Sequence, residues 1–214
     1  MANSSASVGK NDVRIYFSEF FEVGSDVLSQ YGAFDVSCVV DLPLFVDPFL
    51  LFTSKKPEYQ KLHEQIIDYL RFLRDRSLQG NVSEGLLSAW YCFPEVKQNR
   101  LGFCLTGSSG SGLGIMFARA LNENLTRIFT DFGDEKVTKS SHLEKLVLIR
   151  ERVGRDNISD FTTNLIKGYL CEYTQTFARN HIDPAKRRQV RVSKAKFNFE
   201  LCVTYPGWMV TTSS

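Results

Sequence analysis

The sequence has little of several features that identify a protein class at sight. Its 214 residues carry 26 Lys+Arg against 24 Asp+Glu, a balance that excludes a histone-like polycation and an acidic tail protein. The N-terminal stretch MANSSASVGKNDVRIYF lacks the apolar core of a signal peptide. The most apolar run, residues 36–52, is interrupted by Asp41, Pro43 and Asp47. Such a run cannot span a bilayer, so we expect no membrane partner.

Metal-binding and disulfide patterns are absent as well. The five cysteines are odd in number and scattered, without a C-x-x-C pair: Cys38, Cys92, Cys104, Cys171 and Cys202. This spacing excludes a zinc ribbon and argues against a disulfide framework. The three histidines lie far apart and show no metal-ligand spacing, so no metal site is predicted. We expect reduced, buried cysteines and a cytoplasmic location.

Hydrophobic residues, by contrast, are plentiful. They make up 43 % of the chain, and the 17 Phe can fill a core. The length suits one ordinary domain, which we place at residues 13–203 after a flexible arm (1–12) and before an irregular tail (204–214). Helices are predicted at 57–76, 83–93, 115–125, 141–153 and 156–182, and strands at 13–17, 36–46, 100–106 and 190–203. The pattern predicts a helix-rich α/β or α+β domain around a small mixed sheet of three to five strands.

A glycine-rich loop is the most conspicuous local motif. Residues 106–114 read TGSSGSGLG, between an expected strand and an expected helix. Such loops let the backbone approach a phosphate, so we name Gly107, Ser109, Gly110, Gly112 and Gly114 as candidate phosphate-binding residues. The P-loop and dinucleotide-binding fingerprints both fail here, since their lysine and third glycine are missing. The alternative is a flexible loop that permits a sharp turn before the helix.

A few acidic residues and one histidine are candidates for catalysis. Asp156 and Asp160 lie four residues apart at a helix entrance, where they can hold a metal or orient a water. They can equally complement the helix dipole. His142 and Glu144 suggest acid–base chemistry, yet no nuclease motif of the PD-(D/E)xK kind is complete. The sequence therefore names neither a reaction nor a cofactor.

A basic run gives the clearest electrostatic signal. Its members are Lys186, Arg187, Arg188, Arg191, Lys194 and Lys196. On a regular strand these charges divide between two faces. Contact with DNA or RNA phosphates is one interpretation, and protection of an edge strand is the other.

Several phrases of the chain resemble a known family. They are DLPLFVDPFLLF (41–52), PEVKQNRLGF with GSGLG (94–114), SHLEKL (141–146) and GRDNISDFTTNLIKGYL (154–170). Together they resemble a family of uncharacterised bacterial proteins associated with mobile-element and anti-phage defence loci. The resemblance runs from about residue 13 to residue 200 and implies that context, without transferring any catalytic residue.

The C-terminus departs from the pattern that the resemblance implies. In that family the strand matching KFNFEL continues into L-P-x-x-D-G-D-Y, whereas this chain continues as VTYPGWMVTTSS. Back-translation of residues 204–212, read two nucleotides later, permits codons for L-P-R-V-D-G-D-Y. We therefore expect the last ten or so residues to be out of frame and the protein to be a truncated form.

Two functions follow as expectations. The first is a defence- or mobile-element-associated protein that binds nucleic acid or another phosphate-bearing ligand, with a nuclease-like component as its enzymatic version. The second is a non-enzymatic module that binds a protein partner or forms a homo-oligomer, for which the 13 % aromatic content supplies surface.

Overall fold

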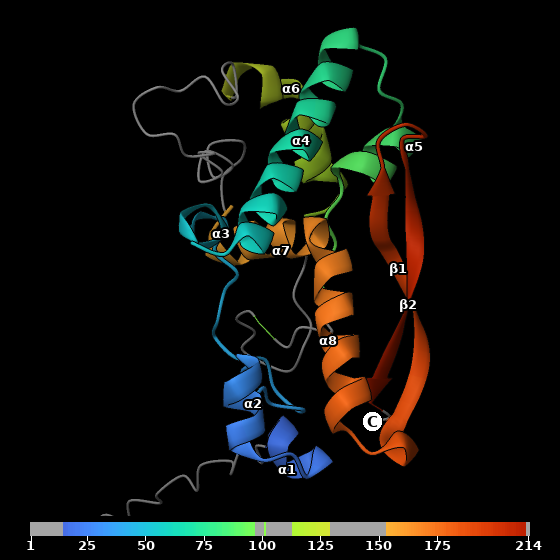
Figure 1. Ribbon diagram of the computed structural model, residues 1–214. Coiled ribbons are helices and arrows are strands. Elements are labelled where there is room, and N and C mark those ends of the chain that lie inside the picture. The colour runs from blue at the N-terminus through green and yellow to red at the C-terminus, as the bar shows by residue number, and fades with distance from the viewer. Residues whose placement is uncertain (1–14, 97–100, 102–112, 129–152, 213–214) are drawn as a thin grey trace, which may run out of the picture.

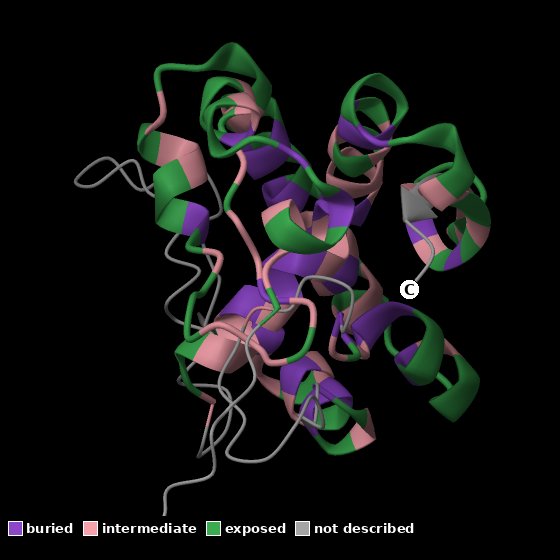
Figure 2. Cartoon of the chain, turned by 90° about the horizontal axis from the view of Figure 1, so that it is seen from below, coloured by how far each residue is buried: buried purple, intermediate pink, exposed green. Residues whose placement is uncertain are grey.

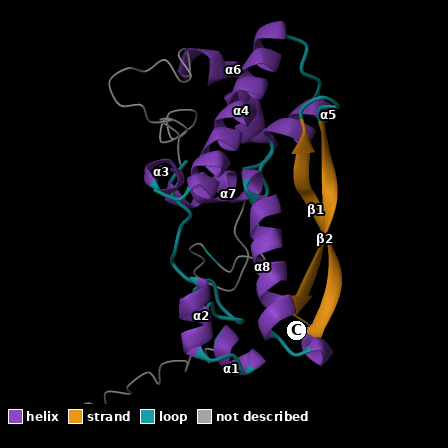
Figure 3. Ribbon diagram, in the orientation of Figure 1, coloured by secondary structure: helices purple, strands orange, loops and turns teal. Residues whose placement is uncertain are grey.

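Helices dominate the computed structural model, which describes residues 15–96, 101, 113–128 and 153–212 (Figure 1). The helices are α1 (Phe17–Phe21), α2 (Ser25–Tyr31), α3 (Pro48–Thr53), α4 (Pro57–Gln79), α5 (Glu84–Leu86), α6 (Ile115–Ile128), α7 (Arg155–Leu165) and α8 (Lys167–His181). A short π-helical turn, η1 (Leu87–Tyr91), follows α5, and a 3-10 turn, η4 (Pro184–Lys186), follows α8. The strands are β1 (Arg187–Asn198) and β2 (Val203–Thr212), which form one antiparallel hairpin (Figure 3).

Helix α4 carries one wall of the main core. Its buried apolar residues recur at steps of three and four, which places them on one side of a helix; they are Leu62, Ile66, Tyr69, Leu70 and Leu73. Pro57 suits the first turn, where no amide donor is required, and Gly80 ends the helix at a φ of 72°. The opposite face is charged. Among the described helices, none combines the length and the apolar content needed to cross a membrane.

The main core fills the space between α4, η1, α6 and α7. Phe117, Leu121 and Leu125 of α6 and Phe161 of α7 are buried in one cluster with the α4 stripe. Figure 2 shows that the buried segments face one another while the outer turns are exposed. Because a close-packed core leaves little void, each of these side chains fixes the distance between two helices.

Two buried tyrosines lock η1 against α4. The hydroxyl of Tyr69 donates to the carbonyl of Trp90 at 2.8 Å, and the hydroxyl of Tyr91 donates to the carbonyl of Leu73 at 2.8 Å. Burial of these hydroxyls is tolerated because each one finds an acceptor. The two bonds hold the π-helical turn in place below α4.

A break at Ile166 separates α7 from α8. The backbone of Ile166 lies at φ −97° and ψ 11°, outside the helical region, and α8 then leaves in a new direction (Figure 1). The lower end of α8 packs against the two N-terminal helices through a second cluster, formed by Phe21, Val23, Leu28, Phe177, Ala178 and Ile182. The sequence prediction of one helix over 156–182 was therefore wrong at this single residue.

The β hairpin lies along α8, which covers one of its faces (Figure 1). Val192 and Ala195 are buried there, three residues apart, because the register shifts between Val192 and Lys196. Lys194 sits in this bulge with a φ of +50°. Gly168 of α8 faces it closely, since a Cβ there would lie 3.0 Å from the carbonyl oxygen of Ala195.

The α+β alternative of the predicted fold class is confirmed, with differences in the sheet. The described strands are two and antiparallel, where a mixed sheet of three to five strands was predicted.

Residues 36–46 form only isolated bridges, because Pro43 and the polar flanks prevent a ladder. Phe17 begins α1 where a strand over 13–17 was predicted. Residues expected as an irregular tail form β2 instead, paired with β1. The reading-frame hypothesis stays a prediction.

Gly207 is the point where the hairpin tolerates no side chain. A Cβ at this residue would lie 2.8 Å from the Cβ of Ala195, so Gly207→Ala forces β2 away from the bulge. We expect this substitution to lower the free energy of unfolding by about 1–3 kcal/mol.

Thermal unfolding followed by circular dichroism measures the effect. Gly85→Ala, at an exposed helical glycine with room for a methyl group, serves as the control and should leave the melting temperature unchanged or slightly raised. Equal melting temperatures for the wild type and Gly207→Ala would contradict the packing.

Candidate functional site

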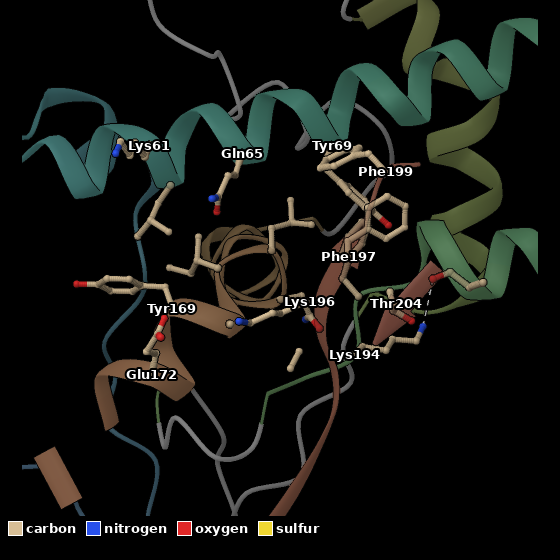
Figure 4. Close-up of a pocket in the computed structure, with 18 of the residues that line it drawn as sticks. Lys61, Gln65, Tyr69, Tyr169, Glu172, Lys194, Lys196, Phe197, Phe199 and Thr204 are labelled. Atoms are coloured by element: carbon tan, nitrogen blue, oxygen red, sulfur yellow. Dashed lines mark hydrogen bonds between the residues drawn. The ribbon is translucent and has the colours of Figure 1, made fainter. Parts of the chain in front are cut away.

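A pocket of about 510 Å³ opens between α4, the α7–α8 junction and the bulged part of β1. Its size is that of a small-molecule site. Figure 4 shows Tyr69, Phe197 and Phe199 at one end, Tyr169 and Glu172 at the other, and Lys196 between them. The break at Ile166 creates one wall, because it turns Gly168 and Tyr169 into the pocket lining.

Three lysines line this pocket, which we call the β1 pocket. Lys61 comes from α4, whereas Lys194 and Lys196 come from β1. The Nζ of Lys194 donates to the carbonyls of Ser88 and Ala89 at 3.2 and 3.3 Å. Lys61 and Lys196 are exposed, and their side chains make no hydrogen bond or ion pair within the described part of the chain. Their ammonium groups are therefore available to a ligand.

A fourth lysine lies buried beside the pocket. Lys167 is the first residue of α8 and donates through Nζ to the Oδ1 of Asn164 at 3.0 Å. Burial lowers the pKa of Lys167; the nearby Cys171 thiol raises it and repulsion from Lys194 lowers it further. The charged form of Lys167 is therefore disfavoured at this place in the fold.

Carboxylates and a tyrosine occupy the far end of the pocket. Glu58 and Glu172 line it and are exposed, so the pocket carries charges of both signs. The ring of Tyr169 meets that of Tyr59 edge-on, with centroids 6.1 Å apart. Burial first, then its hydrogen bond with Tyr59, raises the pKa of Tyr169, so that its hydroxyl keeps the proton at neutral pH.

The predicted basic run does not form one continuous surface. Lys186 pairs with Glu22 at 3.2 Å, and Nε of Arg187 donates to the carbonyl of Ile182 at 2.6 Å. Arg188 and Arg191 are exposed and make no such contact with other described residues. The bulge at Lys194 interrupts the strict alternation expected for this strand, because Val192 and Ala195 are buried at a spacing of three. Lys194 and Lys196, which alternation places on one face, both line the pocket.

The predicted acidic residues are partly described. Asp156 and Asp160 lie on α7, and neither lines the β1 pocket. Burial first, then repulsion from Asp156 and Glu95, raises the pKa of Asp160 to about 7. His142 and Glu144 lie outside the described residues. In the described ranges, no three or more His, Cys, Asp or Glu side chains are grouped to hold a metal ion.

The glycine loop falls almost wholly outside the described residues. This applies to Gly107, Ser109, Gly110 and Gly112. Gly114 is described and precedes α6, where its carbonyl accepts a hydrogen bond from the amide of Ala118 at 3.0 Å. It therefore serves as the entry to a helix, as the sequence predicted for this end of the loop.

Several residues of the pocket were not predicted as site residues from the sequence. On α4 they follow a stripe of spacing three and four beside the core face: Glu58, Lys61, Leu62, Gln65 and Tyr69. Phe197 and Phe199 come from the end of β1 and the hairpin turn. The α4 stripe was a usable signal, because polar residues at helical spacing next to a buried stripe mark a boundary between core and solvent.

Fold and site together define a helix-rich α+β domain with a lysine-lined pocket at a bulged hairpin. The chain belongs to the family described as Domain of unknown function (DUF8370), whose sequence model matches residues 22–203. No curated protein and no solved structure matches the chain.

The raised pKa of Asp160 makes the stability of the protein depend on pH. Its ordinary value is 3.8 and its folded value about 7, so between these values the folded state keeps a proton that the unfolded state has lost. Stability therefore falls as the pH rises from about 4 to 7 and is level above 7. At this half-buried carboxyl, screening by solvent leaves an effect of roughly 1–2 kcal/mol.

Asp160→Asn should remove this fall. Urea unfolding at pH 5 and pH 8 measures it, and the wild type should lose roughly 1–2 kcal/mol more than the variant between the two. Asp68→Asn, at an exposed carboxylate of α4, is the control and should follow the wild type. Parallel pH profiles for the wild type and Asp160→Asn would show that the carboxyl is ionised throughout.

Proposed function

We propose that the chain binds a phosphate-bearing ligand in the β1 pocket. The observation that carries this proposal is that Lys61, Lys194 and Lys196, from two elements distant in sequence, line one pocket. Two of them have no partner among the described residues, and an ammonium group is a strong donor to phosphate oxygens.

The electrostatics of the pocket favour an anion. Burial is the main cause of the lowered pKa of Lys167, and repulsion from Lys194 lowers that pKa further; a bound anion would reduce this repulsion. Glu58 and Glu172 place negative charge at the opposite end, so the phosphate belongs beside Lys196.

The proposed biological setting comes from the sequence. The phrases quoted above support a role in a bacterial defence or mobile-element system, acting on or sensing nucleic acid. The scattered cysteines favour the cytosol, because that compartment keeps thiols reduced. A nuclease-like version would use Asp156 and Asp160 as its acids, at a place separate from the pocket lining.

A second candidate function rests on the exposed end of the hairpin. Leu201 is 63 % exposed, and Phe199, Val203 and Tyr205 beside it are each more than 40 % exposed. Strand β2 contains no charged residue, so nothing of the usual charged kind protects it from pairing with another strand. These features support a non-enzymatic module that pairs with a second copy of this chain.

Binding measurements test the first proposal. We expect AMP and a single-stranded twelve-nucleotide oligo(dA) to bind in low salt. Lys196→Ala should weaken each complex about tenfold, since it removes a charged hydrogen bond, and Lys61→Ala should weaken each complex less, since it removes only a more distant positive charge. Isothermal titration calorimetry measures the affinities. Lys55→Ala, an exposed lysine outside the pocket, is the matched control and should bind as the wild type does.

The sign of the ligand charge has its own test. Glu172→Gln removes a negative charge from the pocket and should tighten binding of both probes several-fold. Weaker binding by Glu172→Gln would mean that the pocket takes a cation. Loss of binding by Arg188→Ala or Arg191→Ala, with Lys196→Ala unaffected, would place the ligand at the exposed arginines of β1 instead.

Sedimentation velocity tests the second candidate. A self-pairing module should form a dimer as the concentration rises, and Leu201→Asp should keep it monomeric because it puts a charge at the apolar end of the hairpin. Leu78→Asp, at another highly exposed leucine near the end of α4, is the control. A monomer at every concentration would exclude this function.

A further inference from the structure

Aromatic rings form one end of the β1 pocket. The rings of Tyr69 and Phe197 meet edge-on with centroids 4.9 Å apart, and those of Phe197 and Phe199 meet edge-on at 5.1 Å. Such contacts fix each ring by its neighbour. Phe199 stands outermost and is 45 % exposed, so part of its ring is uncovered (Figure 4).

This aromatic end offers ring surface and little hydrogen bonding. The hydroxyl of Tyr69 is already committed to the carbonyl of Trp90, and burial raises the pKa of Tyr69, so the group stays a neutral donor to that carbonyl. Polar groups stand beside the rings, namely the amide of Gln65 and the hydroxyl of Thr204. Neither makes a side-chain hydrogen bond within the described residues, so both can address the polar edge of a flat ligand.

Lys196 lies between the aromatic end and the acidic end of the same pocket (Figure 4). Lys196 and Phe197 are adjacent in the sequence, and a strand directs adjacent side chains to opposite sides. Both residues nevertheless line the pocket. A ligand that satisfies both parts must carry a flat apolar group joined to an anionic group.

We propose that the ligand of the β1 pocket is a nucleotide, with its base against the uncovered ring of Phe199 and its phosphate beside Lys196. This inference rests on the proposed binding of a phosphate-bearing ligand and adds the base as the second recognised group. Base–aromatic stacking tolerates any base, since every base has a π face. The shared chemistry is a base linked to a phosphate, either in a free nucleotide or in one unit of a single strand.

The requirement for a base is measured by comparing AMP with ribose 5-phosphate, which carries the same phosphate and sugar. We expect AMP to bind at least tenfold more tightly, the difference that one stacked base supplies. Equal affinities would overturn the inference while leaving phosphate binding in place. Binding of neither compound, nor of oligo(dA), would overturn the proposed function and this inference with it.

Phe199→Leu removes the aromatic ring but keeps an apolar side chain, so it tests the contribution of the ring alone. The variant should weaken AMP about fivefold and leave ribose 5-phosphate unchanged, whereas Lys196→Ala should weaken both. Phe20→Leu is the matched control, because Phe20 on α1 is 44 % exposed and lies outside the pocket. Unfolding curves for the three variants establish that each is folded. Equal AMP affinity in Phe199→Leu and the wild type would overturn the placement of the base.

A salt titration distinguishes the two sources of the nucleotide. A pocket for a free nucleotide binds AMP at least as tightly as oligo(dA). A surface for a single strand binds oligo(dA) more tightly, and the advantage disappears as salt rises, because extra phosphates release counterions. Either result supports recognition of base and phosphate and names the form that the pocket takes.

Discussion

The attachment of the β1–β2 hairpin to the helices is the constraint on which the rest of the structure depends. Two strands alone are marginal in water, since they bury too little apolar surface. Here α8 covers one face, with Val192 and Ala195 buried between them. The turn is tied to η1, where Nε1 of Trp90 donates to the carbonyl of Cys202 at 2.9 Å. A Cβ at Gly168 would lie 3.0 Å from the carbonyl oxygen of Ala195, so the close approach of β1 to α8 depends on glycine.

The pocket is a consequence of this attachment. The bulge that buries Val192 and Ala195 at a spacing of three includes Lys194 and ends at Lys196, and both lysines line the pocket. Lys194 is itself part of the attachment, through its bonds to the carbonyls of η1. Lys196 has no such duty among the described residues. Because the Lys194 side chain is bonded to η1 and the Lys196 side chain is not, we assign ligand contact to Lys196 and positioning to Lys194.

The sequence allowed good predictions where the signal was local. The apolar stripe of α4, its proline start and its glycine end were all readable, because helical periodicity and capping act within a few residues. The break at Ile166 was not, since its flanking residues keep the apolar spacing of a continuous helix. The strand predicted at 36–46 failed because pairing needs a partner strand, which local composition cannot reveal.

The candidate site was harder to predict than the fold. Of the basic run, Lys194 and Lys196 reached the pocket, but Lys186 and Arg187 are engaged in contacts with the chain itself. Asp156 and Asp160 were correctly placed at a helix entrance, yet they stand apart from the pocket lining. Lys61 and Phe199 are separated by more than a hundred residues, and only the docked hairpin brings them to one cavity.

The central claim is that the β1 pocket binds a nucleotide, and amide chemical shifts of the full chain titrated with AMP test it most directly. The account predicts that shifts concentrate at residues of three elements that meet only at the pocket, namely Lys61, Gly168, Lys196 and Phe199. Shifts that gather at Arg188 and Arg191, which lie outside the pocket lining, or a spectrum unchanged by AMP, would contradict it.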